Sequence, residues 1–305
     1  MAIKQVRCKI NGLWTVMTAG SDNTYTATLA APNVTSYNIN DGHYYPITIE
    51  ASNAAGTITT VDDTDGALGS QLKLYVREIT APTITITAPT AQQFLSSATP
   101  AIKFTVVDEA GGSGVNVSSI KVHLDNKEYA VYSQAGAATS ITNGYSVSYT
   151  PIALTDGSHS FYITASDNDG NEATSSTVSF TTDTVAPTLS VTQPSESGSY
   201  VSESAFTVKG TVSDSTSGVD SIKIILNSVD QGAVTISGNT FSKAVTLKSG
   251  TNSVTVTVTD KAGKSTTVTR TIILDTSAPV IASINIVPNP VNVGASYTIT
   301  VTVTG

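Results

Sequence analysis

The stretch GTNSVTVTVTDKAG, residues 250–263, has the pattern of one β-strand followed by a tight turn. Val254, Val256 and Val258 alternate with threonines, so the valines lie on one face and the threonines on the other. This period of two is typical of a half-buried strand. Residues 260–263 are of the kinds that tight turns favour, and we predict that the strand ends there.

Two further copies of this unit lie earlier in the chain. Residues 157–170, GSHSFYITASDNDG, place Phe161, Ile163 and Ala165 on the inner face. Residues 46–56, PITIEASNAAG, form a weaker copy with the same terminal glycine. A strand-and-turn unit that recurs in this way indicates that the chain repeats one β-domain.

An Ala-Pro dipeptide also recurs, with its prolines at Pro82, Pro187 and Pro279. Proline fixes its own φ and holds the preceding residue extended, so each of these boundaries is a short and fairly stiff linker. We therefore predict the following division: module one at residues 1–79, module two at 80–184, module three at 185–277 and a two-strand terminal segment at 278–305.

The composition favours an all-β fold. Charged residues make up only 12% of the chain, and no window of about ten residues shows the helical period of 3.6. Modules two and three each show about seven short strands separated by turn signals, as a β-sandwich of about 100 residues does. The sequence predicts β-sandwiches in tandem.

The charge balance argues against a nucleic-acid partner. The net charge is −8, and Lys4, Arg7 and Lys9 form the only basic cluster, whereas binding to a phosphate backbone requires clustered cations. No stretch of about 18 apolar residues is present, and the first residues show no apolar run of signal-peptide length. We expect no membrane partner, no transmembrane segment and no signal peptide.

Two residues of module one are expected in its core. Cys8, the single cysteine, alternates with Val6 and Ile10, which suggests a small buried hydrophobic residue. Trp14 stands beside Leu13 and close to Val16, which also suggests burial.

No catalytic constellation is recognisable. His43, His123 and His159 are not spaced as zinc ligands, and there is no nucleophile-elbow or nucleotide-binding glycine pattern. We predict that the chain is not an enzyme and has no cofactor other than, in one interpretation, calcium.

That interpretation concerns residues 167–171, DNDGN, which resemble part of a calcium-binding loop. Calcium requires six to eight oxygen ligands, and Asp167, Asp169, Asp183 and Asp108 could converge near the junction of modules two and three. The alternative is a plain hairpin turn, because the corresponding residues 53–56 and 260–264 share only Asp or Asn and Gly. Both interpretations stay open at this point.

Tyr44 and Tyr45 are candidates for stacking on sugar rings. They are adjacent in an expected strand, so one of the two rings must face outward. Single exposed aromatic residues are normal on protein surfaces, which is the plainer explanation.

The terminal segment carries Tyr297, Ile299, Val301 and Val303 in alternation. Two strands cannot bury a core by themselves. Either the sequence is a truncated or capped form of a longer chain, or this strand pairs with a strand of another chain.

The recurring signature, a strand, Asp-x-x-Gly, a further strand and then Asp-Thr-x-Ala-Pro, resembles tandem bacterial Ig-like domains over about residues 80–305. The resemblance implies an all-β string of Ig-like β-sandwich domains. Such modules occur in surface adhesins of Gram-positive bacteria and in structural proteins of tailed phages and prophages, and the chain looks similar to the phage group from Gram-positive gut bacteria.

This resemblance leads to the following functional hypothesis. The chain is a virion component of a tail or decoration type, attached through module one to other virion proteins or to its own copies. Its other modules would bind host-surface polysaccharide weakly and multivalently. The alternatives are a segment of a bacterial cell-surface adhesin or stalk, and a carbohydrate-binding accessory module of an enzyme.

Overall fold

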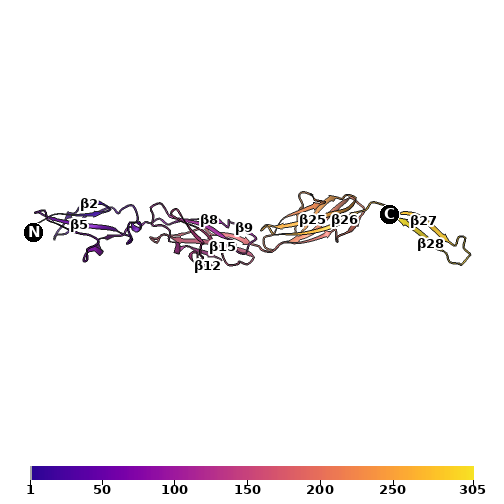
Figure 1. Cartoon of the computed structure of the whole chain (residues 1–305), viewed down its shortest axis with the longest axis horizontal. Coiled ribbons are helices and arrows are strands. Elements are labelled where there is room, and N and C mark those ends of the chain that lie inside the picture. The colour runs from indigo at the N-terminus through magenta and orange to yellow at the C-terminus, as the bar shows by residue number, and fades with distance from the viewer. Residues whose placement is uncertain (1) are drawn as a thin grey trace. The chain divides into compact units, whose positions relative to one another are not determined.

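The computed structural model describes residues 2–305 as strands, turns and four short 3-10 helices, with no α-helix among them (Figure 1). No helix in this described part is long and apolar enough to cross a membrane. The chain forms two compact units: one reaches to Thr181 without residues 94–96, and the other holds residues 94–96 and 182–305. The all-β prediction is confirmed.

Module three consists of two sheets, in the strand orders β18-β20-β24-β23 and β19-β26-β25-β21-β22. Their strands pair antiparallel except for β19 and β26, which are parallel. The opening stretch forms β25, and its valines are at most 1% exposed, as predicted. On the outer face, the hydroxyls of Thr257 and Thr267 are 2.9 Å apart across β25 and β26. The strand bounds are β18 (Thr188–Gln193), β19 (Ser199–Val201), β20 (Ala205–Ser213), β21 (Val219–Leu226), β22 (Val229–Asp230), β23 (Thr235–Ser237), β24 (Thr240–Thr246), β25 (Gly250–Asp260) and β26 (Ser265–Leu274).

Module two repeats this plan, with sheets in the orders β13-β14-β10-β8 and β12-β11-β15-β17-β9, and with β16 paired to β15. Phe161 and Ile163 of β15 are fully buried, as the alternation predicted. The bounds are β8 (Thr83–Ala88), β9 (Gln93–Leu95), β10 (Ile102–Val107), η3 (Val117–Ser119), β11 (Lys121–Leu124), β12 (Lys127–Ala130), η4 (Val131–Ser133), β13 (Ala138–Ile141), β14 (Gly144–Tyr149), β15 (Gly157–Ser166), β16 (Glu172–Thr174) and β17 (Val178–Thr182).

Module one has one main sheet, in the order β2-β1-β5-β6, with β7 paired to β5 and a separate β3-β4 pair. Its buried hydrophobic residues among positions 2–79 are Val6, Cys8 and Tyr45, so the core is small and the prediction for Cys8 is confirmed. The bounds are β1 (Ile3–Ile10), β2 (Leu13–Val16), β3 (Thr18–Ala19), β4 (Tyr25–Thr26), η1 (Ser36–Asn38), β5 (Tyr45–Asn53), β6 (Ile58–Val61), η2 (Gly69–Gln71) and β7 (Lys73–Leu74).

The burial predicted for Trp14 is wrong, since this residue is 38% exposed. Trp14 lies opposite Lys9 in the register of β1 and β2, on the face that alternates with buried Val6 and Cys8. The guanidinium carbon of Arg7 is 4.2 Å from the centre of the indole ring. The ring therefore packs under cationic side chains at the surface and not in the core.

The terminal segment forms a hairpin of β27 (Val280–Val287) and β28 (Thr298–Thr304). Every residue of both strands is exposed. Tyr297, Ile299, Val301 and Val303 are between 47% and 55% exposed. Pairing of this strand with another chain stays a prediction.

Candidate functional site

The three copies of the strand-and-turn unit end in the same hairpin turn. Each turn has a glycine with a φ near +90°, in the region that favours glycine. An Asp or Asn lies three residues before that glycine, and its side-chain Oδ1 accepts the backbone N–H of the residue after the glycine. The distance is 2.8 to 3.0 Å in the pairs Asn53–Thr57, Asp167–Asn171 and Asp260–Lys264. These bonds confirm that the shared Asp or Asn and Gly form a turn.

The surroundings of Asp167, Asp169, Asp183 and Asp108 are described one by one, and their convergence on one calcium site stays a prediction. Both carboxylate oxygens of Asp167 accept hydrogen bonds within its own turn, including one from the amide of Asn171 at 2.7 Å. Asp169 Oδ2 accepts the hydroxyl of Thr35 at 2.5 Å. Asp108 belongs to one carboxylate cluster and Asp183 to another.

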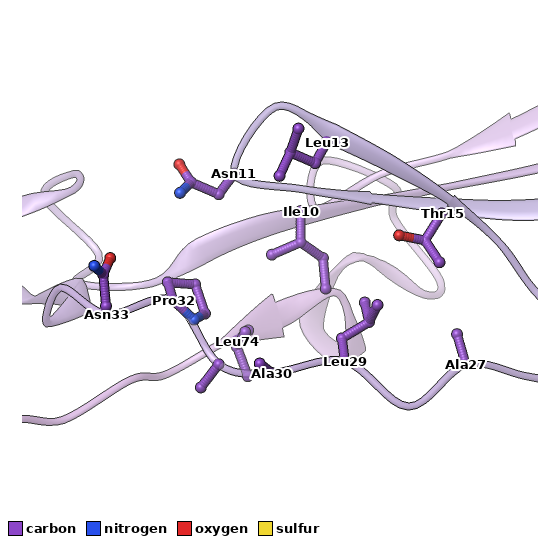
Figure 2. A pocket seen from close by; sticks show the side chains of 11 residues that line it. Ile10, Asn11, Leu13, Thr15, Ala27, Leu29, Ala30, Pro32, Asn33 and Leu74 are labelled. Atoms are coloured by element: carbon purple, nitrogen blue, oxygen red, sulfur yellow. The ribbon is translucent and has the colours of Figure 1, made fainter.

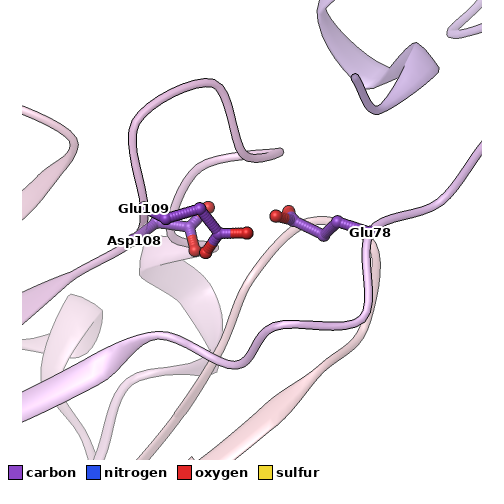
Figure 3. Close-up of side chains that lie close together, drawn as sticks. All are labelled: Glu78, Asp108 and Glu109. Carbon is purple, nitrogen blue, oxygen red and sulfur yellow. The ribbon is translucent and has the colours of Figure 1, made fainter. Parts of the chain in front are cut away.

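The first carboxylate cluster consists of Glu78, Asp108 and Glu109, with one oxygen of each within 4.8 Å of the others. Figure 3 shows the Glu78 carboxyl group directed at the other two. Asp108 is 3% exposed, and its Oδ1 and Glu78 Oε2 have no hydrogen-bond partner among residues 2–305. Burial, followed by the neighbouring carboxyl group of Glu109, raises the pKa of Glu78 above its usual value.

A glycine makes this close approach possible. A Cβ on Gly112 would lie 2.6 Å from Asp108 Oδ2 and 2.7 Å from Glu78 Oε2. The loop backbone therefore packs directly against the carboxylates, and a side chain at this position would displace them.

The second carboxylate cluster consists of Asp183, Asp214 and Asp260, with one oxygen of each again within 4.8 Å of the others. Asp183 is fully buried and Asp260 is 1% exposed. At an effective dielectric constant of about 20, two like charges within this separation repel by at least about 3.5 kcal/mol. None of the ion pairs among residues 2–305 includes these three residues, so no ion pair compensates the repulsion.

The same hydrogen bonds fasten the linker in both clusters. The linker residue accepts a backbone N–H from the serine of the next loop: Ser113 to Glu78 at 2.5 Å, and Ser217 to Asp183 at 3.0 Å. The glycine after that serine donates its backbone N–H to the aspartate that opens the loop. These bonds, from Gly114 to Asp108 and from Gly218 to Asp214, are both 2.7 Å long. Each linker is thus tied to a loop of the module that follows it.

Three further bonds join modules one and two. The Asn38 amide donates to Gly112 O at 2.6 Å, and the Asn171 amide donates to Glu78 O at 3.2 Å. The backbone N–H of Glu78 donates to Asp169 Oδ2, at 3.1 Å. Asp169, predicted as a calcium ligand, thus accepts hydrogen bonds from two residues of module one.

Two tyrosines were predicted as candidates for glycan binding. Tyr45 does not present its ring at the surface, because it is 2% exposed and its hydroxyl donates to Val34 O. Tyr44 is half-buried, with Lys73 Nζ 4.5 Å from the centre of its ring. Its ring meets Tyr75 edge-on at 6.0 Å, and Tyr75 is 61% exposed. The surface pair is therefore Tyr44 and Tyr75. The sequence contained a signal for the exposure of Tyr75, because this residue alternates with the apolar residues Leu74 and Val76.

Module one also has an apolar groove of about 560 Å³. Figure 2 shows Ile10 and Leu13 on one side, and Leu29, Ala30 and Leu74 on the other. Leu13 is 75% exposed. The full lining comprises Ile10, Asn11, Leu13, Thr15, Ala27, Leu29, Ala30, Ala31, Pro32, Asn33 and Leu74.

Sequence reasoning missed Glu78, Glu109, Asp214 and Asp260 as cluster members. A signal was present, because the loops at 108–115 and 214–219 both begin with Asp at a strand end and contain Ser-Gly-Val. Aligning the second loop with the first would have pointed to Asp214 as a cluster member, because it occupies the position of Asp108.

The raised pKa of Glu78 gives a testable pH dependence. Since the folded state holds this proton more tightly than the unfolded state, its contribution to stability is present at acidic pH. It is lost as the pH rises from the usual glutamate pKa through the raised one. We expect Glu78→Gln to keep the bond from Ser113 and to remove this loss. Calorimetric unfolding should show Glu78→Gln melting higher than the parent at neutral pH, with a smaller difference at pH about 4. An equal difference at both pH values contradicts the assignment.

Comparison with known proteins identifies two of the modules. Residues 92–184 match the family model of a bacterial Ig-like domain, and residues 187–276 match that of glucodextranase, domain B. Bacillopeptidase F of Bacillus subtilis (strain 168) is 30% identical over 163 residues, which are 53% of this chain and 10% of that protein. The chain thus spans about a tenth of this curated relative.

Similar solved structures include the fibronectin(III)-like modules of Clostridium thermocellum CbhA, with 16% identity, 63% of this chain and 94% of that chain covered, and a TM-score of 0.40. Another is the Bacteroides ovatus SGBP-B in complex with a mixed-linkage heptasaccharide, with 13% identity, coverage of 95% and 69%, and a TM-score of 0.23. The matched domain and the sheets described above agree, and modules two and three are Ig-like β-sandwiches in tandem.

Proposed function

We propose that this chain is a non-catalytic structural and interaction protein that holds Ig-like modules in series and presents their surfaces for binding. One observation carries the proposal: both linkers use a carboxylate, Glu78 or Asp183, to accept a backbone N–H from the following loop. A linker that only tethers two modules flexibly would need no hydrogen bond to the following loop. A repeated attachment suits a protein whose task is to keep modules at a set spacing.

The setting we propose is the virion of a tailed phage or prophage, and this part rests on the sequence resemblance alone. Attachment would occur through module one, to other virion proteins or to further copies of the chain. The apolar groove around Leu13 supports that assignment, because module one buries few hydrophobic residues of its own. The alternative setting is a bacterial surface adhesin or stalk.

A second candidate function is carbohydrate binding. The match of residues 187–276 to domain B of a glucodextranase favours it. In module one, the exposed ring of Tyr75 beside Tyr44 offers a surface on which a sugar ring could stack. Binding by one such pair is weak, so it would act through many copies of the chain.

The spacing role predicts a narrow distance distribution between modules one and two. Spin labels on cysteines at Thr59 and Ser140, both exposed, would report it in a Cys8→Ser background by pulsed electron paramagnetic resonance. Glu78→Ala combined with Asp169→Ala removes the carboxylate acceptors of three of the bonds between these modules and should broaden the distribution. Asp65→Ala, which alters only a turn of module one, is the control. An equally broad distribution in the parent and the double variant would refute the spacing role.

The virion setting predicts self-association through module one. The mass of the purified chain in solution, with negative-stain electron microscopy, should show a closed oligomer joined at one end. Leu13→Asp places a charge in the groove and should yield monomers, while Leu68→Asp, at another exposed leucine of module one, should not. A monomeric parent would instead favour the adhesin or stalk.

A further inference from the structure

The second carboxylate cluster has an oxygen that no group in the protein satisfies. Oδ2 of Asp260 has no hydrogen-bond partner among residues 2–305, although the residue is 1% exposed. A buried carboxylate oxygen without a donor is costly, because it has lost its water and gained nothing in return. Ser217, which donates its N–H to Asp183, also has a buried hydroxyl without a partner.

The other two turns show how the chain avoids this cost elsewhere. In module one the position belongs to Asn53, which carries no charge. In module two it is Asp167, whose Oδ2 accepts the Asn171 amide at 2.7 Å. In module three Lys264 stands where Asn171 stands in module two. Its backbone N–H bonds to Asp260 Oδ1 at 2.8 Å, but no side chain reaches Oδ2.

Each carboxylate of the second cluster is already held in place by backbone amides. Asp183 Oδ1 accepts Val185 N–H at 3.1 Å, and Asp214 Oδ1 accepts Gly218 N–H at 2.7 Å. These bonds orient the side chains without cancelling their charge. The cluster is therefore a preformed set of oxygen ligands with a net negative charge.

We propose that Asp183, Asp214 and Asp260 bind one divalent cation, with Ca²⁺ the best fit. Two oxygens bound to the same Ca²⁺ at about 2.4 Å can be at most about 4.8 Å apart. The three ligand atoms lie within 4.8 Å of one another. Carboxylate oxygens are the ligands that Ca²⁺ prefers, and the cation would supply the positive charge that no ion pair provides.

Such a cation would connect three separate segments of the second unit. Asp183 belongs to the linker, Asp214 opens the loop before β21, and Asp260 ends β25. The ion would hold the linker against both loops of module three. This inference does not depend on the proposed function, because it concerns only the chemistry of these residues.

The test is isothermal titration calorimetry of the full chain with CaCl₂ after removal of metals by a chelator, with native mass spectrometry for the stoichiometry. We expect one Ca²⁺ bound at this cluster, with a dissociation constant in the micromolar to millimolar range. Asp260→Asn should weaken binding at least about tenfold, because a neutral amide replaces a charged ligand. This variant should fold, since Asn53 occupies the same turn position in module one.

Lys264→Asn is a second variant that leaves every ligand in place. Its amide should cap Asp260 Oδ2 as Asn171 caps Asp167 and should also weaken binding. Asp167→Asn, in module two, is the matched control and should bind Ca²⁺ as the parent does. Absence of Ca²⁺ binding at millimolar concentration would overturn the proposal. So would binding that survives Asp260→Asn, or that is lost in Glu109→Gln instead, which would place the ion in the first cluster.

Discussion

A carboxylate that leaves water at a module boundary must find hydrogen-bond donors, and this constraint shapes both linkers. Glu78 and Asp183 find theirs in the backbone amides of Ser113 and Ser217. The loops can offer these amides because they are rich in glycine and serine, and Gly112 leaves room for the carboxylates to approach. The path of each linker and the position of each acidic cluster both follow from these bonds.

The three hairpin turns show how a small sequence difference changes the chemistry of one backbone. Asn53, Asp167 and Asp260 make the same bond to the N–H after the glycine. The three turns differ in the charge of this side chain and in the residue that follows the glycine. With an uncharged side chain, or with a capping amide, the turn is complete, whereas Lys264 leaves Asp260 with an unused oxygen.

The fold was predictable from sequence because alternation reports burial directly. Val254, Val256 and Val258 are buried, and so are Phe161 and Ile163. Alternation was less informative at the edge of module one, where Trp14 lies among the cationic residues of the outer face. The acidic clusters were not predictable from one loop at a time, since Glu78 joins Asp108, and Asp214 and Asp260 join Asp183, from segments distant in sequence.

The amide hydrogen exchange of Ser113 and Ser217, followed by nuclear magnetic resonance on the full chain, tests the central claim most directly. Both residues lie in loops rich in glycine and serine, where amides without a protein acceptor exchange quickly. If the linker carboxylates hold these N–H groups, both amides will exchange much more slowly than that of Gly111, which lies in the loop of Ser113. Glu78→Ala will then release Ser113 alone. Exchange at the rate of Gly111 for both serines would contradict the account of how the modules are joined.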